Sequence, residues 1–286
     1  MDGELPLISY NLPMGVRFLL FLFVLLFPIK AFSLSLYLPY RYPGSLGYFR
    51  LNSVGPAKAV LGYRGKKWVF RSLKGSRELF FVIPYGVRGD FSLTLYQGKR
   101  RLFFRSFKVW KKKYRISRIW VKERPLRGAL LERVKREGRL LRRLLSEITP
   151  KKFKERKLRP PLKRLSISTP FGAKRIINGK RRSIHWGTDF RAPKGTTVYA
   201  ALSGRVVLAK NLYFTGNTVI IDHGLGIHTL YAHLSKITVK EGQFVKAGQV
   251  IGKVGSTGRS TGPHLHFGIY VQGERADPML VMKERL

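Results

Sequence analysis

The chain lacks cysteine and is poor in acidic residues. Without cysteine it can form neither a disulfide framework nor a lipid-modified cysteine anchor. Its 286 residues include 56 Lys and Arg but only 15 Asp and Glu, which leaves a formal net charge of +41. A surface this basic attracts polyanions such as nucleic acid, anionic lipid headgroups or a negatively charged cell-envelope polymer. The length allows a large core and one to three domains.

The apolar run near the N-terminus is too short to span a bilayer. It covers residues 18–27, follows Arg17, and is succeeded by Pro28 and the small residues Ala31 and Ser33. A secretory signal needs about 7–15 apolar residues, whereas a membrane-spanning helix needs about 20. We therefore predict a signal peptide over residues 1–33 and export to the periplasm or cell envelope. An uncleaved membrane anchor is the alternative.

The positive charge is concentrated in the middle of the chain. Residues 1–98, 99–182 and 183–286 carry net charges of +8, +27 and +6. Within the middle part, residues 126–148 have apolar side chains at spacings of three and four among many Arg and Lys, which predicts one amphipathic basic helix. We interpret it as a linker helix that packs its leucine stripe on a neighbouring domain. A helix that binds nucleic acid or a membrane surface would have a similar pattern.

Both flanking regions have the pattern of β-structure, so the predicted fold class is mainly β. Residues 34–110 show short alternating segments between glycine turns, which predicts a small β-sandwich. Residues 111–165 are predicted to be a basic linker that contains the helix, with an exposed stretch between Pro150 and Pro160. Residues 166–286 are predicted to be a compact antiparallel β domain without helices, with strands near residues 197–202, 205–209, 218–222, 228–234, 248–254 and 265–270.

All six histidines lie between positions 185 and 266. His264 and His266 are two residues apart on a predicted strand, so both point to the same face while Leu265 points to the core. His185 and Asp189 are four apart, but Gly187 makes a helix there unfavourable. An irregular entry into a strand can bring these two side chains together.

His233 lies on a further predicted strand, in the segment Tyr231–Leu234. Neutral imidazole and carboxylate are ligands that suit zinc, and a catalytic zinc site uses three protein ligands and leaves the fourth position to water. The cluster offers four imidazoles and one carboxylate. Three of these five should bind metal and two should transfer protons, and the residues by themselves leave that division open.

The order and spacing of these residues resemble those of the lysostaphin-type (LytM-like) zinc peptidases, which cleave bacterial cell-wall peptides. The resemblance runs from residue 166 to about residue 278. It is carried by residues 168–172 (STPFG), 178–179 (NG), 185–189 (HWGTD), 231–235 (YAHLS) and 255–267 (GSTGRSTGPHLHF). It implies a small β-sheet domain with a groove across one sheet. It also implies that His185, Asp189 and His266 bind Zn²⁺ and that His233 and His264 are catalytic.

The function that the resemblance implies is a zinc-dependent endopeptidase acting on the stem-peptide crosslinks of peptidoglycan. No Glu accompanies the metal motif, unlike in the HExxH peptidases, so histidine is expected to carry the protons. The expected partners are peptidoglycan and, through the basic segment, anionic envelope polymers or membrane headgroups. His223 and His228 are expected to be structural.

Three other functions fit parts of the same sequence. A non-catalytic cell-wall-binding regulator of other hydrolases is the main alternative, and the presence of all five site residues argues against it. Residues 241–251 have the hairpin rhythm of biotinyl and lipoyl carriers but lack a lysine at a symmetric tip. The predicted signal peptide argues against nucleic acid as a partner.

Overall fold

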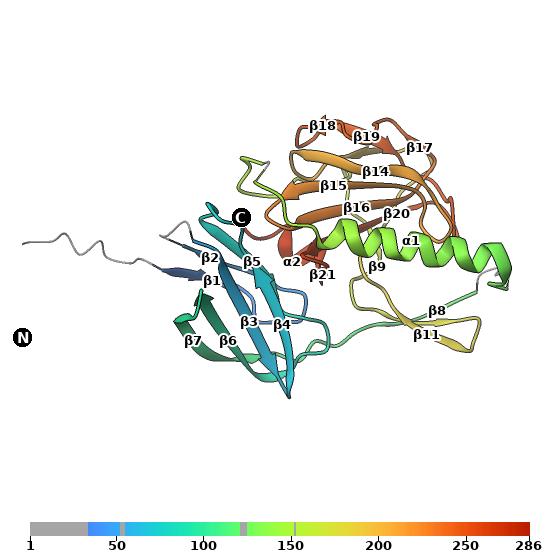
Figure 1. The fold of residues 1–286 in the computed structure, drawn as a ribbon. Helices are drawn as coiled ribbons and strands as arrows, with labels where there is room; N and C mark the ends of the chain where they lie inside the picture. Colours follow the sequence, from blue (N-terminus) through green and yellow to red (C-terminus); the bar gives the residue numbers. More distant parts are fainter. Residues whose placement is uncertain (1–33, 52–54, 121–124, 152) are drawn as a thin grey trace, which may run out of the picture. The chain divides into compact units, whose positions relative to one another are not determined.

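The N-terminal region is a pair of packed antiparallel sheets. The computed structural model describes residues 34–51, 55–120, 125–151 and 153–286. Within these residues, one sheet of the N-terminal region has the strand order β1-β2-β5 and the other has the order β4-β3-β6-β7 (Figure 1). The strands are β1 Ser35–Tyr37, β2 Leu46–Arg50, β3 Ala57–Tyr63, β4 Lys66–Arg71, β5 Glu78–Val82, β6 Gly89–Gln97 and β7 Arg100–Val109.

Aromatic side chains fill the space between these two sheets. Phe49 of β2 lies 5.3 Å from Phe103 of β7, measured between ring centroids, and Phe81 of β5 lies 6.4 Å from Phe70 of β4. The alternating apolar residues of β6 are buried as their spacing predicts. The predicted β-sandwich is therefore confirmed. The predicted signal peptide lies outside the described residues, and no helix within them is long and apolar enough to cross a membrane.

The basic helix is present as α1 (Gly128–Ser146) and lies across one face of the large C-terminal sheet (Figure 1). Leu140, Leu141, Leu144 and Leu145 pack against apolar residues of that sheet, including Tyr270. The interpretation of a helix that packs its leucine stripe on a neighbouring sheet is confirmed.

The segment after α1 was predicted to be an exposed linker, and this prediction is wrong. Phe153, Leu158 and Leu162 are buried among the core residues. The backbone N–H of Arg159 donates to Ala201 O at 2.8 Å, which ties the segment to the C-terminal region. Residues 154–157 form a charged and largely exposed run, while the apolar residues on either side of it are buried and hold the stretch in place.

A strand also lies within the predicted linker. β8 (Ile116–Ile119) pairs in parallel with β10 (Lys174–Ile177), which pairs in turn with β11 (Arg181–Ile184). This three-stranded sheet joins residues almost 60 positions apart in the chain. Its strands are short and their pairing is non-local, so the local pattern gave no indication of it.

The C-terminal region is dominated by a large antiparallel sheet, as predicted. Within the described residues its strand order is β18-β14-β15-β16-β20-β12-β9, and β21 pairs with β20. A smaller sheet has the order β13-β19-β17. The strands are β9 Ile167–Thr169, β12 Thr188–Arg191, β13 Thr197–Tyr199, β14 Gly204–Leu212, β15 Gly216–Gly224, β16 Ile227–Leu234, β17 Lys236–Ile237, β18 Phe244–Val245, β19 Val250–Lys253, β20 His264–Val271 and β21 Glu274–Ala276.

The large sheet has one face in the core and one face that carries the histidines. Leu265 and Phe267 of β20 are fully buried, as is Phe190 of β12. His264, His266 and Tyr270 of β20 alternate with those core residues and lie on the other face, which α1 covers at the Tyr270 end. The sheet therefore leaves the histidine end of this face available for a site.

The C-terminal region also contains a one-turn helix, which was not predicted. It is α2 (Pro278–Val281), and the Asp277 side chain caps it by accepting from Met279 N at 3.0 Å. Four residues are too few to show helical periodicity in a sequence. Asp277 N donates to Gly44 O at 2.9 Å, one of the contacts that join residues 33–286 into one compact unit. Separate folding of residues 34–110 and 166–286 stays a prediction.

Candidate metal centre and its groove

Three side chains from separate segments bring one ligand atom each to a common point. His185 lies between β11 and β12, Asp189 lies on β12, and His266 lies opposite Asp189 in the register of β20. His185 Nε2 is 2.9 Å from Asp189 Oδ1 and 3.0 Å from His266 Nδ1. His266 Nδ1 is 2.7 Å from the same Asp189 oxygen. The three residues predicted to be metal ligands therefore lie together in the fold.

The local sequence explains how the chain reaches this point without a helix. The backbone N–H of His185 donates to Ala173 O at 2.9 Å, which fixes its position before β12 begins. Gly187 then passes directly beside β20, where a Cβ atom would lie 2.5 Å from Phe267 O and 2.7 Å from His266 Cε1. Only glycine fits at this close approach. The predicted irregular entry into the strand is present.

The donor chemistry of the cluster fits a metal cation. His185 Nδ1 lies 3.1 Å from Pro170 O, which can only accept, so we assign the ring proton to Nδ1. Burial lowers the pKa of His185 to about 4, so the ring is neutral near pH 7 and Nε2 presents a lone pair to the cluster. Burial alone would raise the pKa of Asp189, but the two imidazoles lower it well below its usual value. A cation balances these converging lone pairs and the carboxylate.

The second carboxylate oxygen of Asp189 is held by an arginine. Arg175 of β10 donates from Nη2 to Asp189 Oδ2 at 2.5 Å, while Oδ1 faces the two imidazoles. The Asp189 side chain is 5% exposed and that of Arg175 is 22% exposed. Such an outer contact fixes the orientation of a ligand and leaves one of its oxygens for the metal.

A second pair of histidines lies beside the cluster. The ring centroids of His233 and His264 are 4.7 Å apart, and that of His233 is 6.1 Å from His266. His233 Nδ1 is 2.8 Å from Thr257 O, and His264 Nδ1 is 2.8 Å from Gly262 O. Carbonyl oxygens accept, so both rings carry a proton on Nδ1 and have Nε2 free for substrate or water.

An unusual backbone conformation sets the direction of the His233 side chain. Strand alternation from Tyr231, which is fully buried in the core, would place the His233 ring on the core side as well. The backbone of His233 instead has φ of 62°, in the left-handed region that few non-glycine residues adopt. This turns the ring toward His264. Burial, followed by the neighbouring His266 and His264, lowers the pKa of His233 to about 3.

A groove of about 350 Å³ lies beside the ligand cluster and the second histidine pair. Its walls include Asp189, His233 and His264, and also Ile119 from β8. Besides Arg175 it is lined by two more arginines, Arg191 of β12 and Arg259 of the loop before β20. The groove that the resemblance implied is therefore present, and it is basic. Residues 259–263 of the loop before β20 also line it, together with Ser168 and Thr169.

Comparison with known proteins identifies the family. The model of peptidase family M23 matches residues 183–278, which contain all five predicted site residues. The crystal structure of an M23 peptidase from Pseudomonas aeruginosa is 30% identical, with a TM-score of 0.63 over 86% of this chain and 96% of that one. The chain belongs to peptidase family M23. The similarity to the Pseudomonas protein extends through the N-terminal sheets as well as the M23 domain.

Other relatives match the M23 domain alone. The peptidoglycan DD-endopeptidase ShyA of Vibrio cholerae is 48% identical over 114 residues, which are 40% of this chain and 26% of ShyA. The catalytic domain of lysostaphin from Staphylococcus simulans is 39% identical over 42% of this chain and 93% of that domain, with a TM-score of 0.39. The resemblance inferred from the motifs is confirmed. This chain matches about a quarter of the length of its first curated relatives.

The remaining two histidines of the M23 domain lie away from the groove. His223 is fully buried, with Nδ1 2.9 Å from Ser203 O and Nε2 2.8 Å from Thr229 Oγ1. His228 is also buried, and its Nε2 is 3.7 Å from Asp222 Oδ1. Both positions agree with the structural role expected from the sequence.

Arg175 and Ile119 are parts of the site that the sequence pattern does not predict. Both reach the groove from the sheet β8-β10-β11, and neither is part of the motif segments that carry the resemblance. Arg191 is the last residue of the ligand strand β12, and Arg259 lies inside the glycine-rich loop motif. A basic residue at either position of a known motif could have been proposed as a substrate contact.

Proposed function

We propose that this chain is a zinc-dependent endopeptidase that hydrolyses stem-peptide crosslinks in bacterial peptidoglycan. The observation that carries the proposal is the convergence of His185 Nε2, Asp189 Oδ1 and His266 Nδ1 within 3.0 Å of one another, beside the groove that Asp189 lines. Two imidazoles and one carboxylate form a known catalytic zinc ligand set that keeps one position open. The neighbouring pair of histidines supplies the proton-transfer groups that a hydrolytic site needs.

A zinc ion held by these ligands supplies a Lewis acid, which polarises the scissile carbonyl and acidifies water. The chain's own residues handle the protons. Thr257 O accepts from His233 Nδ1, so Nε2 of His233 can take a proton while the ring charge is shared with that carbonyl. His264 is held in the same way by Gly262 O and is closer to solvent, with 16% of its side chain exposed. This position suits it to pass a proton to the leaving amine.

The groove's charge supports a substrate with carboxylates. Arg191 and Arg259 line it in addition to Arg175, which is occupied by Asp189. Arg259 is held over the Phe214 ring at 4.5 Å, which restricts its position. Peptidoglycan stem peptides carry free carboxylates, and arginine binds these by two hydrogen bonds. The name of the ShyA relative, a peptidoglycan DD-endopeptidase, supports the same substrate.

The proposal includes export and contact with anionic envelope components. A peptidoglycan hydrolase meets its substrate in the periplasm or cell envelope, and the charge of +41 favours polyanionic neighbours there. The regulator alternative gains no support from the geometry, because both the ligand cluster and the catalytic pair are complete.

The test is metal analysis of purified variants together with digestion of purified peptidoglycan. His185→Ala, Asp189→Ala and His266→Ala should each lose bound zinc and reduce the release of peptide fragments to background, because two ligands do not hold a catalytic zinc. Mass spectrometry of the fragments released by the unchanged protein identifies the bond cleaved.

His228→Gln is the matched control, since it alters a buried histidine outside the groove. It should keep both zinc and the released fragments, although its melting temperature can fall. Full fragment release by metal-free protein, or by Asp189→Ala, would contradict the proposal. Zinc binding with no hydrolysis of any peptidoglycan would favour the regulator alternative.

A further inference from the structure

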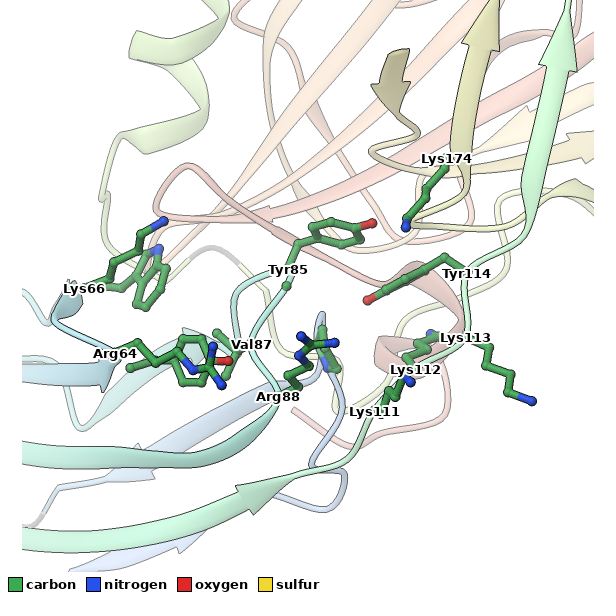
Figure 2. Close-up of a pocket in the computed structure, with 14 residues that line it drawn as sticks. Arg64, Lys66, Tyr85, Val87, Arg88, Lys111, Lys112, Lys113, Tyr114 and Lys174 are labelled. Atoms are coloured by element: carbon green, nitrogen blue, oxygen red, sulfur yellow. The ribbon is translucent and has the colours of Figure 1, made fainter.

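A second cavity, of about 790 Å³, lies where the N-terminal sheets meet the M23 domain (Figure 2). Seven cations line this cavity, which we call the cationic pocket, and six of these have no ion-pair partner among the described residues. They come from four separate segments: the β3–β4 turn, the loop after β5, the stretch after β7 and strand β10. They are Arg64, Lys66, Arg88, Lys111, Lys113 and Lys174.

No acidic side chain among the described residues forms an ion pair with these six cations, and none lines the cavity. Lys112, the seventh cation at the wall, is different because its Nζ is paired with the buried carboxylate of Asp277. Six like charges around one cavity repel one another and raise the local concentration of anions. The charge therefore points to a ligand with several negative groups.

Tyr114 adds a hydrogen-bond donor to the same cavity. Its hydroxyl is buried and has no hydrogen-bond partner in the part of the chain that the structure describes. Burial raises the pKa of Tyr114, so the group is a neutral O–H near pH 7. Figure 2 shows the Tyr114 hydroxyl pointing toward the space that Arg88 enters. An unmade buried hydrogen bond is costly, and an anionic oxygen in this space would accept it.

The uncharged part of the wall is aromatic. Tyr63, Trp68 and Tyr85 line the cavity beside the cations. Tyr85 is fixed by Tyr114 and Trp186, with ring centroids 4.7 and 5.2 Å away. Flat aromatic faces pack against the apolar faces of sugar rings, and they also stack with nucleic-acid bases.

We propose that the cationic pocket binds a saccharide that carries more than one phosphate group. Phosphate is favoured over carboxylate because each phosphate offers three acceptor oxygens and up to two charges, which matches six unpaired cations and one O–H donor. The choice of a saccharide over nucleic acid rests on the proposed function, since a peptidoglycan hydrolase works among envelope glycans.

The pocket is placed to hold the enzyme next to its substrate. Lys174 lines the cationic pocket and the next residue, Arg175, lines the catalytic groove. Consecutive residues of a strand point to opposite faces, so strand β10 separates the two cavities. A phosphorylated glycan bound at Lys174 would keep the groove within reach of neighbouring peptidoglycan and leave it open.

The test is a calorimetric titration of the full chain with the 1,4′-bisphosphate of β-1,6-linked glucosamine disaccharide. The double variant Arg88→Ala/Lys174→Ala should weaken binding by about 10- to 100-fold, because two charge-assisted contacts are lost. Tyr114→Phe, which keeps the ring, should weaken it by about 3- to 10-fold. Arg139→Ala/Arg142→Ala is the control, since it removes the same charge from the exposed face of α1.

Equal affinity in the unchanged protein and in Arg88→Ala/Lys174→Ala would overturn the proposal. Tighter, variant-sensitive binding of a single-stranded thymidine 12-mer would overturn it in favour of nucleic acid. Variant-sensitive binding of phosphatidylglycerol vesicles that equals binding of the disaccharide would overturn it in favour of a lipid surface. Displaying the same disaccharide on phosphatidylcholine vesicles then separates a lipid-linked source from a free one. The titration needs no turnover, so a failure of peptidase activity is recognised independently.

Discussion

The two cavities on either side of β10 differ in how their polar groups are held. In the catalytic groove, His185, Asp189, His233 and His264 each have a second atom fixed by a carbonyl or by Arg175. In the cationic pocket, six charged side chains lack such partners among the described residues. Bond cleavage requires fixed geometry, whereas attraction of a polyanion requires charge at roughly the right distance. We therefore expect the two sides of β10, the central strand of its sheet, to serve two different physical tasks.

The largest effect that separates these cavities is expected from His233→Ala. The variant should keep its zinc and lose about 10²- to 10⁴-fold in kcat on a soluble crosslinked peptide, because a proton-transfer group is removed. The measurement is kinetics combined with metal analysis. The matched variant across β10, Arg88→Ala/Lys174→Ala, should leave kcat on the same soluble peptide unchanged. Loss of zinc from His233→Ala would contradict its role as a proton carrier.

The sharpest comparison uses the adjacent residues Arg175 and Lys174. Arg175→Ala should lower metal affinity or activity by about 10- to 100-fold, since Asp189 loses the contact that orients it. Lys174→Ala should change neither on a soluble peptide. Metal titration and kinetics on both variants decide the matter. Arg175→Lys should restore part of the loss, because a cation near Asp189 is kept without the planar guanidinium. Equal losses of metal affinity or activity in Arg175→Ala and Lys174→Ala would contradict the assignment of these two side chains to different cavities.

Salt should affect the two cavities unequally. Raising the salt from about 50 to about 200 mM screens the charges and lowers the entropy gained when counterions are released on binding, so phosphosaccharide binding should weaken severalfold. Turnover of a small soluble peptide should change less, because Asp189 and His233, which act on the scissile bond, are buried. Parallel titrations and kinetics at each salt concentration measure both. Salt-independent binding in the cationic pocket would exclude an electrostatic origin.

The five residues of the candidate site could be singled out in the sequence because short-range spacing marks them, and their roles stay a proposal. The two-residue spacing puts His264 and His266 on one face, and Gly187 permits the close approach beside His185. The assignment of roles came from the resemblance to the family. The left-handed backbone at His233 could not be predicted, since it depends on how β16 is held between its neighbours.

The parts of the site that were missed depend on pairing between distant segments. Ile119 and Arg175 reach the groove only because β8 pairs with β10. The linker prediction failed for the same reason. Charge density around Lys157 suggested exposure, yet Leu158 beside it is 3% exposed. By contrast, the periodicity of residues 126–148 was sufficient for α1, because helical hydrogen bonds and leucine spacing are local.

The smallest expected effect concerns Glu284, a carboxyl group that is buried outside both cavities. Both carboxylate oxygens of Glu284 lack hydrogen-bond partners within the described residues, and burial raises its pKa to about 8. The folded state therefore holds the proton more tightly than the unfolded chain, whose Glu has a pKa near about 4.3. Stability is highest below the unfolded pKa and falls as pH rises toward 8. Glu284→Gln removes this titration. The melting temperature of the variant, relative to that of the unchanged protein, should therefore rise as pH rises from about 5 to about 8. Differential scanning calorimetry across this range measures the trend, with the exposed Glu147→Gln as the control for lost charge. If the difference in melting temperature between the variant and the unchanged protein stays constant with pH, Glu284 is ionised in the folded state and the prediction is wrong.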